Sequence, residues 1–213
     1  MNLLITAGPT REAIDPVRYL TNRSSGKMGY ALAEVAARHG HKVLLVSGPT
    51  SLDLPPGVDF LPVESAADMF DAVRNQIGKA DAAVFAAAVA DYRPAAPSAE
   101  KIKKTSETMT LELVRNPDIL GSARATFHFP GVLVGFAAET DDLEANARAK
   151  LEKKGCDLVV ANDVSRPGIG FDSDHNEVLL VYPDRLEPLA RDTKDRLAHI
   201  ILDAIVELHA SRA

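Results

Sequence analysis

The chain has 213 residues, of which 46% are hydrophobic and 25% charged, and its formal net charge is -6 at pH 7. This composition is typical of a globular protein, and the negative charge argues against a nucleic-acid-binding protein, which is expected to carry a basic face. The single cysteine, Cys156, excludes an intramolecular disulfide and fits a reducing compartment. No apolar run has the length of a membrane span and the N-terminus lacks a signal-peptide pattern, so we expect a cytoplasmic protein without a membrane partner.

Short β-rich apolar runs alternate with helical patterns along the chain. The run 83–87 is apolar on both faces, which suits the centre of a parallel sheet, and the apolar spacing in 27–39 predicts a helix with one buried face. The alternation predicts a doubly wound, Rossmann-like three-layer α/β domain with a mainly parallel sheet, spanning 1–213 as one domain. The predicted strands are 2–6, 42–46, 58–63, 82–87, 109–114, 131–137, 157–161 and 177–182, and the predicted helices are 27–39, 65–78, 117–125, 141–154 and 189–209.

The segment 22–29, Asn-Arg-Ser-Ser-Gly-Lys-Met-Gly, joins the first strand to the first helix. Free backbone N–H groups and the dipole at a helix start favour phosphate, and Ser24 and Ser25 add hydroxyl donors. Gly26 allows the backbone to approach a ligand closely. The segment matches neither the P-loop nor the dinucleotide fingerprint, so a serine N-cap with small residues for packing is the alternative interpretation.

Three long loops, at 7–26, 89–108 and 162–175, interrupt the alternation of strands and helices. Long loops inside a compact domain are usually functional or disordered. Ligands of open α/β sheets bind beyond the carboxyl ends of the strands, and all three loops leave strands at that edge. The sequence therefore predicts that they converge on one site.

The second of these loops supplies candidate polar side chains. Asp91 either helps to hold Mg²⁺ between phosphates or caps the loop. Lys101 lies in a lysine-rich stretch that either closes over phosphates or is a solvated basic turn. Further along, 116–118 (Asn-Pro-Asp) predicts a helix start with Pro117 at the first position, which could also face a nucleotide.

The predicted helix 141–154 carries Lys150 and Lys154 on one face, where they also complement the helix dipole. Cys156 precedes a predicted buried strand, so we expect a core residue rather than a nucleophile. The six histidines have no metal-ligand spacing, and there is no Ser-His-Asp or Cys-His signature.

Short motifs spread over nearly the whole chain carry a more specific pattern. They are 5–12, 15–19, Asn22 with 24–29, 47–49, 86–93, 101–104, 116–119, 134–140, and 161–164 followed by 170–171. With these motifs, in this order, the chain resembles bacterial phosphopantothenate–cysteine ligase, also called phosphopantothenoylcysteine synthetase, the synthetase half of the bifunctional coenzyme A biosynthesis protein.

The resemblance implies a two-step ligation. CTP activates the carboxylate of 4′-phosphopantothenate, which releases pyrophosphate and leaves an acyl-cytidylate. The amine of L-cysteine then attacks this anhydride and expels CMP. The resemblance further implies Mg²⁺ with the nucleotide and no flavin in this chain, and the forms of 101–104, 116–118 and 135–140 resemble the bacterial, CTP-using branch rather than the eukaryotic, ATP-using branch.

The resemblance also assigns residues. Lys101 matches the mobile-loop lysine of the first half-reaction, and Asn22 matches the asparagine that supports conversion of the intermediate. We expect Asp91 to be the metal ligand. We expect the nucleotide to be bound by Gly8, Ser24, Ser25, Gly26, Ala87, Asp91, Lys101, Pro117, Asp118, Ile119, Leu120, Phe136, Lys150 and Lys154.

Partners and alternatives follow from the same comparison. Many bacterial members carry an N-terminal flavin-dependent decarboxylase, so the chain is either a stand-alone synthetase or an excised domain with a fused or separate decarboxylase partner. The family is dimeric through a strand extension, for which 109–115 and the strand pair 172–183 are the two candidates. The alternative functions are an NAD(P)-dependent Rossmann reductase or epimerase, against which the incomplete fingerprint and the missing Tyr-x-x-x-Lys pair argue, and a non-catalytic nucleotide-sensing module.

Overall fold

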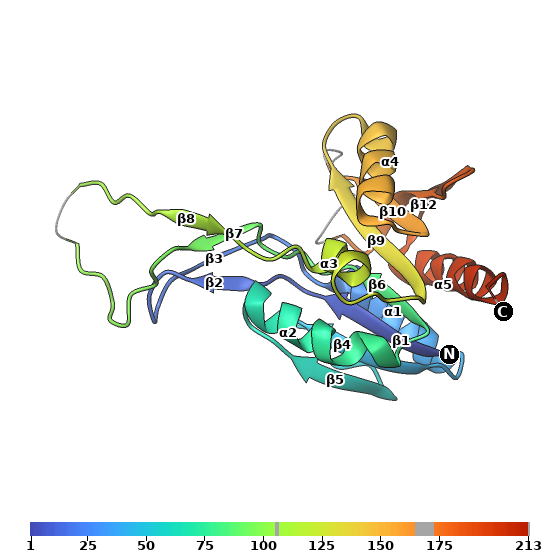
Figure 1. Ribbon diagram of the computed structural model, residues 1–213, viewed down its shortest axis with the longest axis horizontal. Helices are drawn as coiled ribbons and strands as arrows, with labels where there is room; N and C mark the ends of the chain where they lie inside the picture. The colour runs from blue at the N-terminus through green and yellow to red at the C-terminus, as the bar shows by residue number, and fades with distance from the viewer. Residues whose placement is uncertain (105–106, 165–172, 213) are drawn as a thin grey trace.

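An eight-stranded sheet forms the centre of the structure, a computed structural model that describes residues 1–104, 107–164 and 173–212 (Figure 1). The strands from β10 to β5 run parallel, and β11 and β12 extend the sheet antiparallel at one edge. In spatial order the strands are β12 (Leu186–Thr193), β11 (His175–Val181), β10 (Leu158–Asp163), β9 (Val132–Glu139), β6 (Ala82–Phe85), β1 (Asn2–Ala7), β4 (Lys42–Ser47) and β5 (Val58–Pro62).

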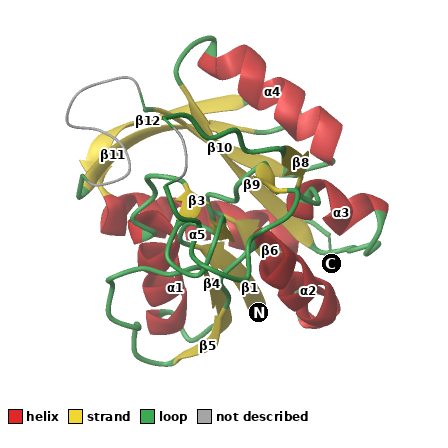
Figure 2. Ribbon diagram, turned by 90° about the vertical axis from the view of Figure 1, so that its left-hand side faces the viewer, coloured by secondary structure: helices red, strands yellow, loops and turns green. Residues whose placement is uncertain are grey.

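Helices cover both faces of this sheet, as Figure 2 shows. Two apolar clusters form the core, one on each face, and each contains the buried stripe of the helices that cover it. This confirms the predicted doubly wound three-layer α/β fold. One face carries α1 (Lys27–Arg38) and α5 (Lys194–Ala210), and the other carries α2 (Ala66–Gln76), the 3-10 helix η1 (Ile77–Lys79), α3 (Ile119–Ala125) and α4 (Leu143–Lys154).

The chain reverses the direction in which it adds strands between β1 and β6. From β1 it proceeds to β4 and β5 on one side, and then returns through β6 to β9 and β10 on the other. The loops that leave the carboxyl ends of β1 and β6 therefore diverge and leave a crevice between them. In open α/β sheets this position is where ligands bind.

Two small antiparallel sheets extend away from the main sheet (Figure 1). We call them, with the described residues that connect their strands, the arm. Asp15 holds the arm together. Its buried carboxylate accepts hydrogen bonds from the Arg18 guanidinium and from the N–H groups of Val17, Arg18 and Ile102. The contact with the Arg18 guanidinium in particular holds the pKa of Asp15 well below its usual range. The sheets are β2 (Arg11–Ala13) with β3 (Tyr19–Thr21) and β7 (Tyr92–Pro94) with β8 (Leu113–Arg115).

Several element predictions were wrong for identifiable reasons. The helix predicted at 189–209 begins at Lys194, because Leu186–Thr193 forms the mostly exposed edge strand β12 and the Thr193 side chain accepts from the N–H of Arg196 to cap α5. The strand predicted at 109–114 is only β8, and it lies in the arm. The strands β2, β3 and β7 were missed because three residues are too few to show a period.

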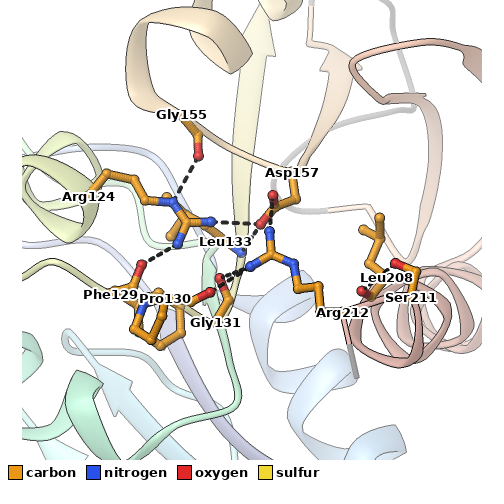
Figure 3. Close-up of polar contacts among 10 residues, drawn as sticks. All are labelled: Arg124, Phe129, Pro130, Gly131, Leu133, Gly155, Asp157, Leu208, Ser211 and Arg212. Atoms are coloured by element: carbon orange, nitrogen blue, oxygen red, sulfur yellow. Dashed lines mark hydrogen bonds and ion pairs between the residues drawn. The ribbon is translucent and has the colours of Figure 1, made fainter.

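The carboxylate of Asp157 ties the C-terminal end of the chain to the sheet, as Figure 3 shows. It contacts both Arg124 of α3 and Arg212 beyond α5, and accepts a 2.7 Å hydrogen bond from the N–H of Leu133. The Arg212 guanidinium also donates to the carbonyls of Pro130 (2.6 Å) and Gly131 (3.0 Å). Among the described residues, no helix is long and apolar enough to cross a membrane, while a cytoplasmic location stays a prediction.

We expect the change Asp157→Ala to lower the free energy of unfolding by about 2 kcal/mol, because it leaves two guanidinium groups and one N–H without their shared acceptor. Urea denaturation of both proteins measures this. Asp184→Ala is the matched control. Within the described part of the chain Asp184 forms only an exposed pair with Arg185 at 3.7 Å, so its loss is expected to cost less than about 0.5 kcal/mol. Equal effects of the two changes would contradict this role of Asp157.

Candidate active site

Two adjoining cavities lie where the loops after β1 and β6 diverge. The α1 cavity, of about 270 Å³, is lined by the start of α1, and the α3 cavity, of about 500 Å³, by the start of α3 and by α4. Because the two cavities share lining residues, they form one continuous site that can hold an elongated ligand. The shared residues are Ala87, Val89, Asp91, Phe136 and Lys150.

The start of α1 opens into the α1 cavity. Its N-cap is Gly26, which has a φ of 79° and no side chain to bind the first N–H groups of the helix. The alternative of a serine N-cap is therefore wrong, and the Ser24 hydroxyl instead accepts a 3.3 Å hydrogen bond from the N–H of Gly26 itself. The backbone from Gly26 to Gly29 lines the cavity, so the helix presents donors and the positive end of its dipole there.

The backbone of Gly8 packs closely against this loop. It is buried, and a Cβ added to Gly26 would lie 3.3 Å from the Gly8 Cα. A side chain at Gly8 would itself come within 2.8 Å of the Gly48 carbonyl. Gly8 lies outside the two cavities, so its contribution is the close approach of two backbone segments.

The α3 cavity is built around charged groups at the ends of two helices. Asp118 caps α3 by accepting from the Gly121 N–H at 2.9 Å, and it pairs with Lys154 of α4. Burial opposes ionisation of Asp118, but the hydrogen bonds from Lys154 and Gly121 outweigh it, so its pKa is lowered. The predicted position of Pro117 inside α3 was wrong, since the helix begins after Asp118.

Lys150 of α4 lies between the two cavities. Its Nζ donates to the carbonyl of Phe136 at 2.6 Å. Burial lowers the pKa of Lys150, against the opposing charge of Glu139. An ammonium group that has lost part of its hydration gains more from a bound anion than an exposed one does.

Most of the predicted site residues meet at this site. Asn22 lies at its edge, lining a neighbouring cavity of about 440 Å³ with Ser24 and Ser25, and its Nδ2 donates to the Ala88 carbonyl at 3.0 Å. Around the two main cavities the structure places Ser24, Ser25, Gly26, Ala87, Asp91, Pro117, Asp118, Ile119, Leu120, Phe136, Lys150 and Lys154.

Lys101 is not brought to the site. It is exposed in the arm and lies outside these three cavities. The next residue, Ile102, is fixed there, since its N–H donates to Asp15 at 3.1 Å and its carbonyl accepts from Arg18 at 2.9 Å. Of the third long loop, residues 165–172 lie outside the described part of the chain.

Asp91 is exposed and lines both cavities. Among the residues that the structure describes, no cluster of three or more His, Cys, Asp or Glu side chains could hold a metal ion by itself. A single carboxylate fits Mg²⁺, which is commonly held by one or two carboxylates together with substrate phosphates.

Three buried polar residues of the α1 cavity were not assigned a role from the sequence. They are Asn162, at the end of β10, Asn176, at the start of β11, and Lys194, at the start of α5. Asn162 belongs to the third long loop region, which was a usable signal, but the meeting of the three depends on how β11 and α5 return to the crevice.

The fold and the site together define a doubly wound α/β protein with a crevice at its topological switch point, lined by cations and by the N–H groups of a helix start. Comparison with known sequences narrows this class. The chain belongs to the DNA/pantothenate metabolism flavoprotein C-terminal domain family, whose sequence pattern matches residues 1–208.

Individual relatives agree with this family. The coenzyme A biosynthesis bifunctional protein CoaBC of Vibrio parahaemolyticus is 52% identical over 209 residues, which cover 97% of this chain and 52% of that protein. The chain therefore spans about half the length of the curated relatives it matches. A crystal structure of the C-terminal domain of a CoaBC protein is similar with 43% identity and a TM-score of 0.81, covering 96% of this chain and 93% of that one.

A more distant structure shows the same fold. It is a Cab2 mutant in complex with phosphopantothenate-cysteine, with 18% identity and a TM-score of 0.77, and the match covers 99% of this chain and 86% of that chain.

The buried thiol of Cys156 is expected to be unreactive. Burial raises the pKa of Cys156 to about 12, so almost none of it is thiolate near neutral pH. Labelling with iodoacetamide at pH 8 should be about 100-fold slower in the native protein than in urea. Labelling at the same rate in both would show that Cys156 is accessible and that the core position is wrong.

Proposed function

We propose that this domain is a phosphopantothenate–cysteine ligase. It uses CTP to join 4′-phosphopantothenate and L-cysteine through an acyl-cytidylate, with release of pyrophosphate and CMP. The observation that carries the proposal is the crevice that holds the open start of α1 and the half-buried ammonium of Lys150, with Asn22 at its edge. The relatives named as coenzyme A biosynthesis proteins support a role in that biosynthesis.

The nucleotide is proposed to lie along the two connected cavities. The α3 cavity offers the Asp118–Lys154 pair and the apolar surface of Ile119, Leu120 and Phe136 to a nucleoside. Lys150 lies at the junction with the α1 cavity, where a phosphate would meet both its charge and the dipole of α1. Positive charges fixed around the α-phosphate would stabilise the charge that develops as pyrophosphate leaves.

Asn22 is proposed to act on the acyl-cytidylate. Its carboxamide lies between the start of α1 and the loop after β6, where Nδ2 is held by the Ala88 carbonyl. An amide side chain can hydrogen-bond the acyl oxygen and does not compete with cysteine as a nucleophile. The amine of cysteine then forms the amide bond while the bond from the acyl carbon to the CMP oxygen breaks.

Mg²⁺ is proposed to be held by Asp91 together with the phosphates of CTP. When bound, the ion would neutralise phosphate charge during release of pyrophosphate. Asp91 is well placed for this because it lines both cavities.

The arm is proposed to be the contact between two copies of this chain. The sequence offers two candidate segments for this contact, 109–115 and 172–183. In the second, β11 already pairs with β10 on one side and β12 on the other, whereas the arm, which contains 109–115, exposes large apolar side chains. An exposed apolar surface of this kind marks an interaction site. The large apolar side chains that the arm exposes are Val17, Tyr19, Tyr92, Met109 and Leu113.

Two other functions have less support. A Rossmann reductase or epimerase has no specific observation in its favour, since α1 starts with a Ser-Ser-Gly loop and not with the dinucleotide fingerprint. A nucleotide-sensing module would bind CTP without turnover, so that Asn22 and Lys101 would be dispensable.

The first test incubates the protein with CTP, Mg²⁺, 4′-phosphopantothenate and L-cysteine and measures pyrophosphate and CMP. Release of both is expected. We propose that Lys101 reaches the crevice by movement of the arm or from a second copy and there acts on charge in the transition state, so Lys101→Gln should slow pyrophosphate release about 100-fold while CTP affinity changes less than about threefold. The matched control is Lys42→Gln, an exposed lysine at the amino end of β4. No release with any nucleotide would overturn the ligase proposal.

The change Asn22→Asp should separate the two half-reactions. We expect the first turnover of pyrophosphate to remain within about tenfold of the original protein, while phosphopantothenoylcysteine formation falls about 100-fold, since the lost donor acts on the intermediate. Rapid-quench measurement of both products tests this, with Asn75→Asp, on the exposed side of α2, as control. An equal loss in both steps would contradict the assignment of Asn22.

A further inference from the structure

A third cavity, of about 440 Å³, adjoins the site beside the loop that precedes α1. We call it the arginine cavity, because Arg11 and Arg23 line it. It shares lining residues with the α1 cavity, so the loop before α1 forms the wall between the two. The shared residues are Ser24, Ser25 and Lys27. The path proposed for the nucleotide runs through the other two cavities and does not enter this one.

The charge of the arginine cavity selects the kind of ligand. Three cations and no carboxylate line it among the residues that the structure describes, namely Arg11, Arg23 and Lys27. Lys27 shares its charge with Asp174, at 2.7 Å, so the two guanidinium groups are the main cations left to a ligand. A guanidinium group binds a carboxylate through two parallel hydrogen bonds, so an organic carboxylate fits this cavity.

The two arginines differ in how they are held. The Cζ of Arg11 lies 4.6 Å from the centroid of the Tyr19 ring, and its Nη1 lies 3.8 Å from the carboxylate of Glu64. Arg11 is therefore kept in place by its neighbours. Arg23 is exposed, and within the described ranges its side chain forms no hydrogen bond or ion pair. Its guanidinium group is available to a ligand.

Asn22 links the arginine cavity to the reacting centre. It lines this cavity, and its Nδ2 donates at 3.0 Å to the carbonyl of Ala88, which lines the α1 cavity. Arg23 is the next residue and lines the same cavity as Asn22. In an α-amino acid the amine and the carboxylate are bonded to one carbon. A carboxylate bound beside Asn22 would therefore hold its amine close to the acyl group on which Asn22 is proposed to act.

The same charges suit the amine of such a ligand. The nucleophile has to be the neutral amine, because an ammonium group has no free electron pair. A carboxylate beside the amine would favour the ammonium form, whereas nearby cations favour the neutral form. In the described part of the chain the arginine cavity offers cations only. It thus fits an amino acid that is bound through its carboxylate and reacts through its amine.

We propose that the arginine cavity is the subsite for the carboxylate of the amino acid that is ligated, with Arg23 as a specificity-determining residue and Arg11 as the second cation. The inference rests on the proposed function, because it takes L-cysteine as that amino acid. In the ligation the amine nitrogen bonds to the acyl carbon, the electron pair of the acyl C–O bond leaves with CMP, and one amine proton passes to water. The cavity positions the amine for this step.

The test compares acyl acceptors, using the whole chain with saturating CTP, Mg²⁺ and 4′-phosphopantothenate. L-Cysteine methyl ester keeps the amine and the thiol but has no carboxylate charge. Hydroxylamine traps the activated acyl group as a hydroxamate and has no carboxylate to bind. We expect kcat/KM for the ester to be lower than that for cysteine by about tenfold or more, because the ester forms no ion pair with a guanidinium group.

A change at Arg23 locates the effect. Arg23→Gln should raise the KM for cysteine by about tenfold or more and leave the rate of hydroxamate formation within about twofold, since it removes a contact to cysteine alone. Arg23→Lys, which keeps the charge, should recover part of the loss. Arg74→Gln is the control, because Arg74 is an exposed residue of α2 that pairs with Asp71 at 3.0 Å. Thermal denaturation checks that each variant is folded.

Several results would overturn the subsite. They are equal use of cysteine and its methyl ester, an unchanged KM for cysteine in folded Arg23→Gln, and an equal loss with cysteine and hydroxylamine. A raised KM for 4′-phosphopantothenate without a change for cysteine would also overturn it and assign the cavity to the acid. If no nucleotide supports hydroxamate formation, the ligase proposal fails and the subsite with it. If hydroxamate forms with CTP but use of cysteine does not depend on Arg23, the subsite alone fails.

Discussion

The site depends on one close contact between backbone segments, where the start of α1 rests directly on the end of β1. A Cβ added to Gly29 would lie 2.6 Å from the Cβ of Ala7, and one added to Gly26 would lie 3.3 Å from the Gly8 Cα. Because no side chain separates the two segments, the first turn of α1 points into the crevice beside β6. The contact thus fixes where the free N–H groups of the helix are available to an anion.

Around this contact the structure divides its tasks between the sheet and the arm. The sheet and its helices supply fixed charge at Lys150 and capped helix ends at Asp118, all held by short hydrogen bonds. The arm carries Lys101 and most of the exposed apolar side chains, and the buried carboxylate of Asp15 stabilises it. A ligand that needs Lys101 must therefore meet the arm by movement of that segment or from a second copy of the chain.

The sequence allowed the parallel sheet and its helices to be predicted because strands buried on both faces and amphipathic helices have clear periods. The edge strand β12 and the arm strands lacked such a period, since most residues of β12 are exposed and the arm strands have three residues each. The position of the segment 22–29 at the crevice was predictable from the chemistry of a helix start. The meeting of Asn162, Asn176 and Lys194 at the α1 cavity was not predictable, because it depends on the antiparallel return of β11 and the position of α5. The placement of Lys101 away from the cavities was equally invisible, as it depends on hydrogen bonds between two loops.

The central claim is that one crevice forms an activated acyl-cytidylate before cysteine takes part. Exchange of labelled pyrophosphate into CTP tests it most directly, because reversal of the first step alone returns the label to the nucleotide. The account expects exchange that requires 4′-phosphopantothenate and Mg²⁺ and proceeds without cysteine. Exchange that occurs only with cysteine, or product formation without any exchange, would contradict a separate first step in this crevice.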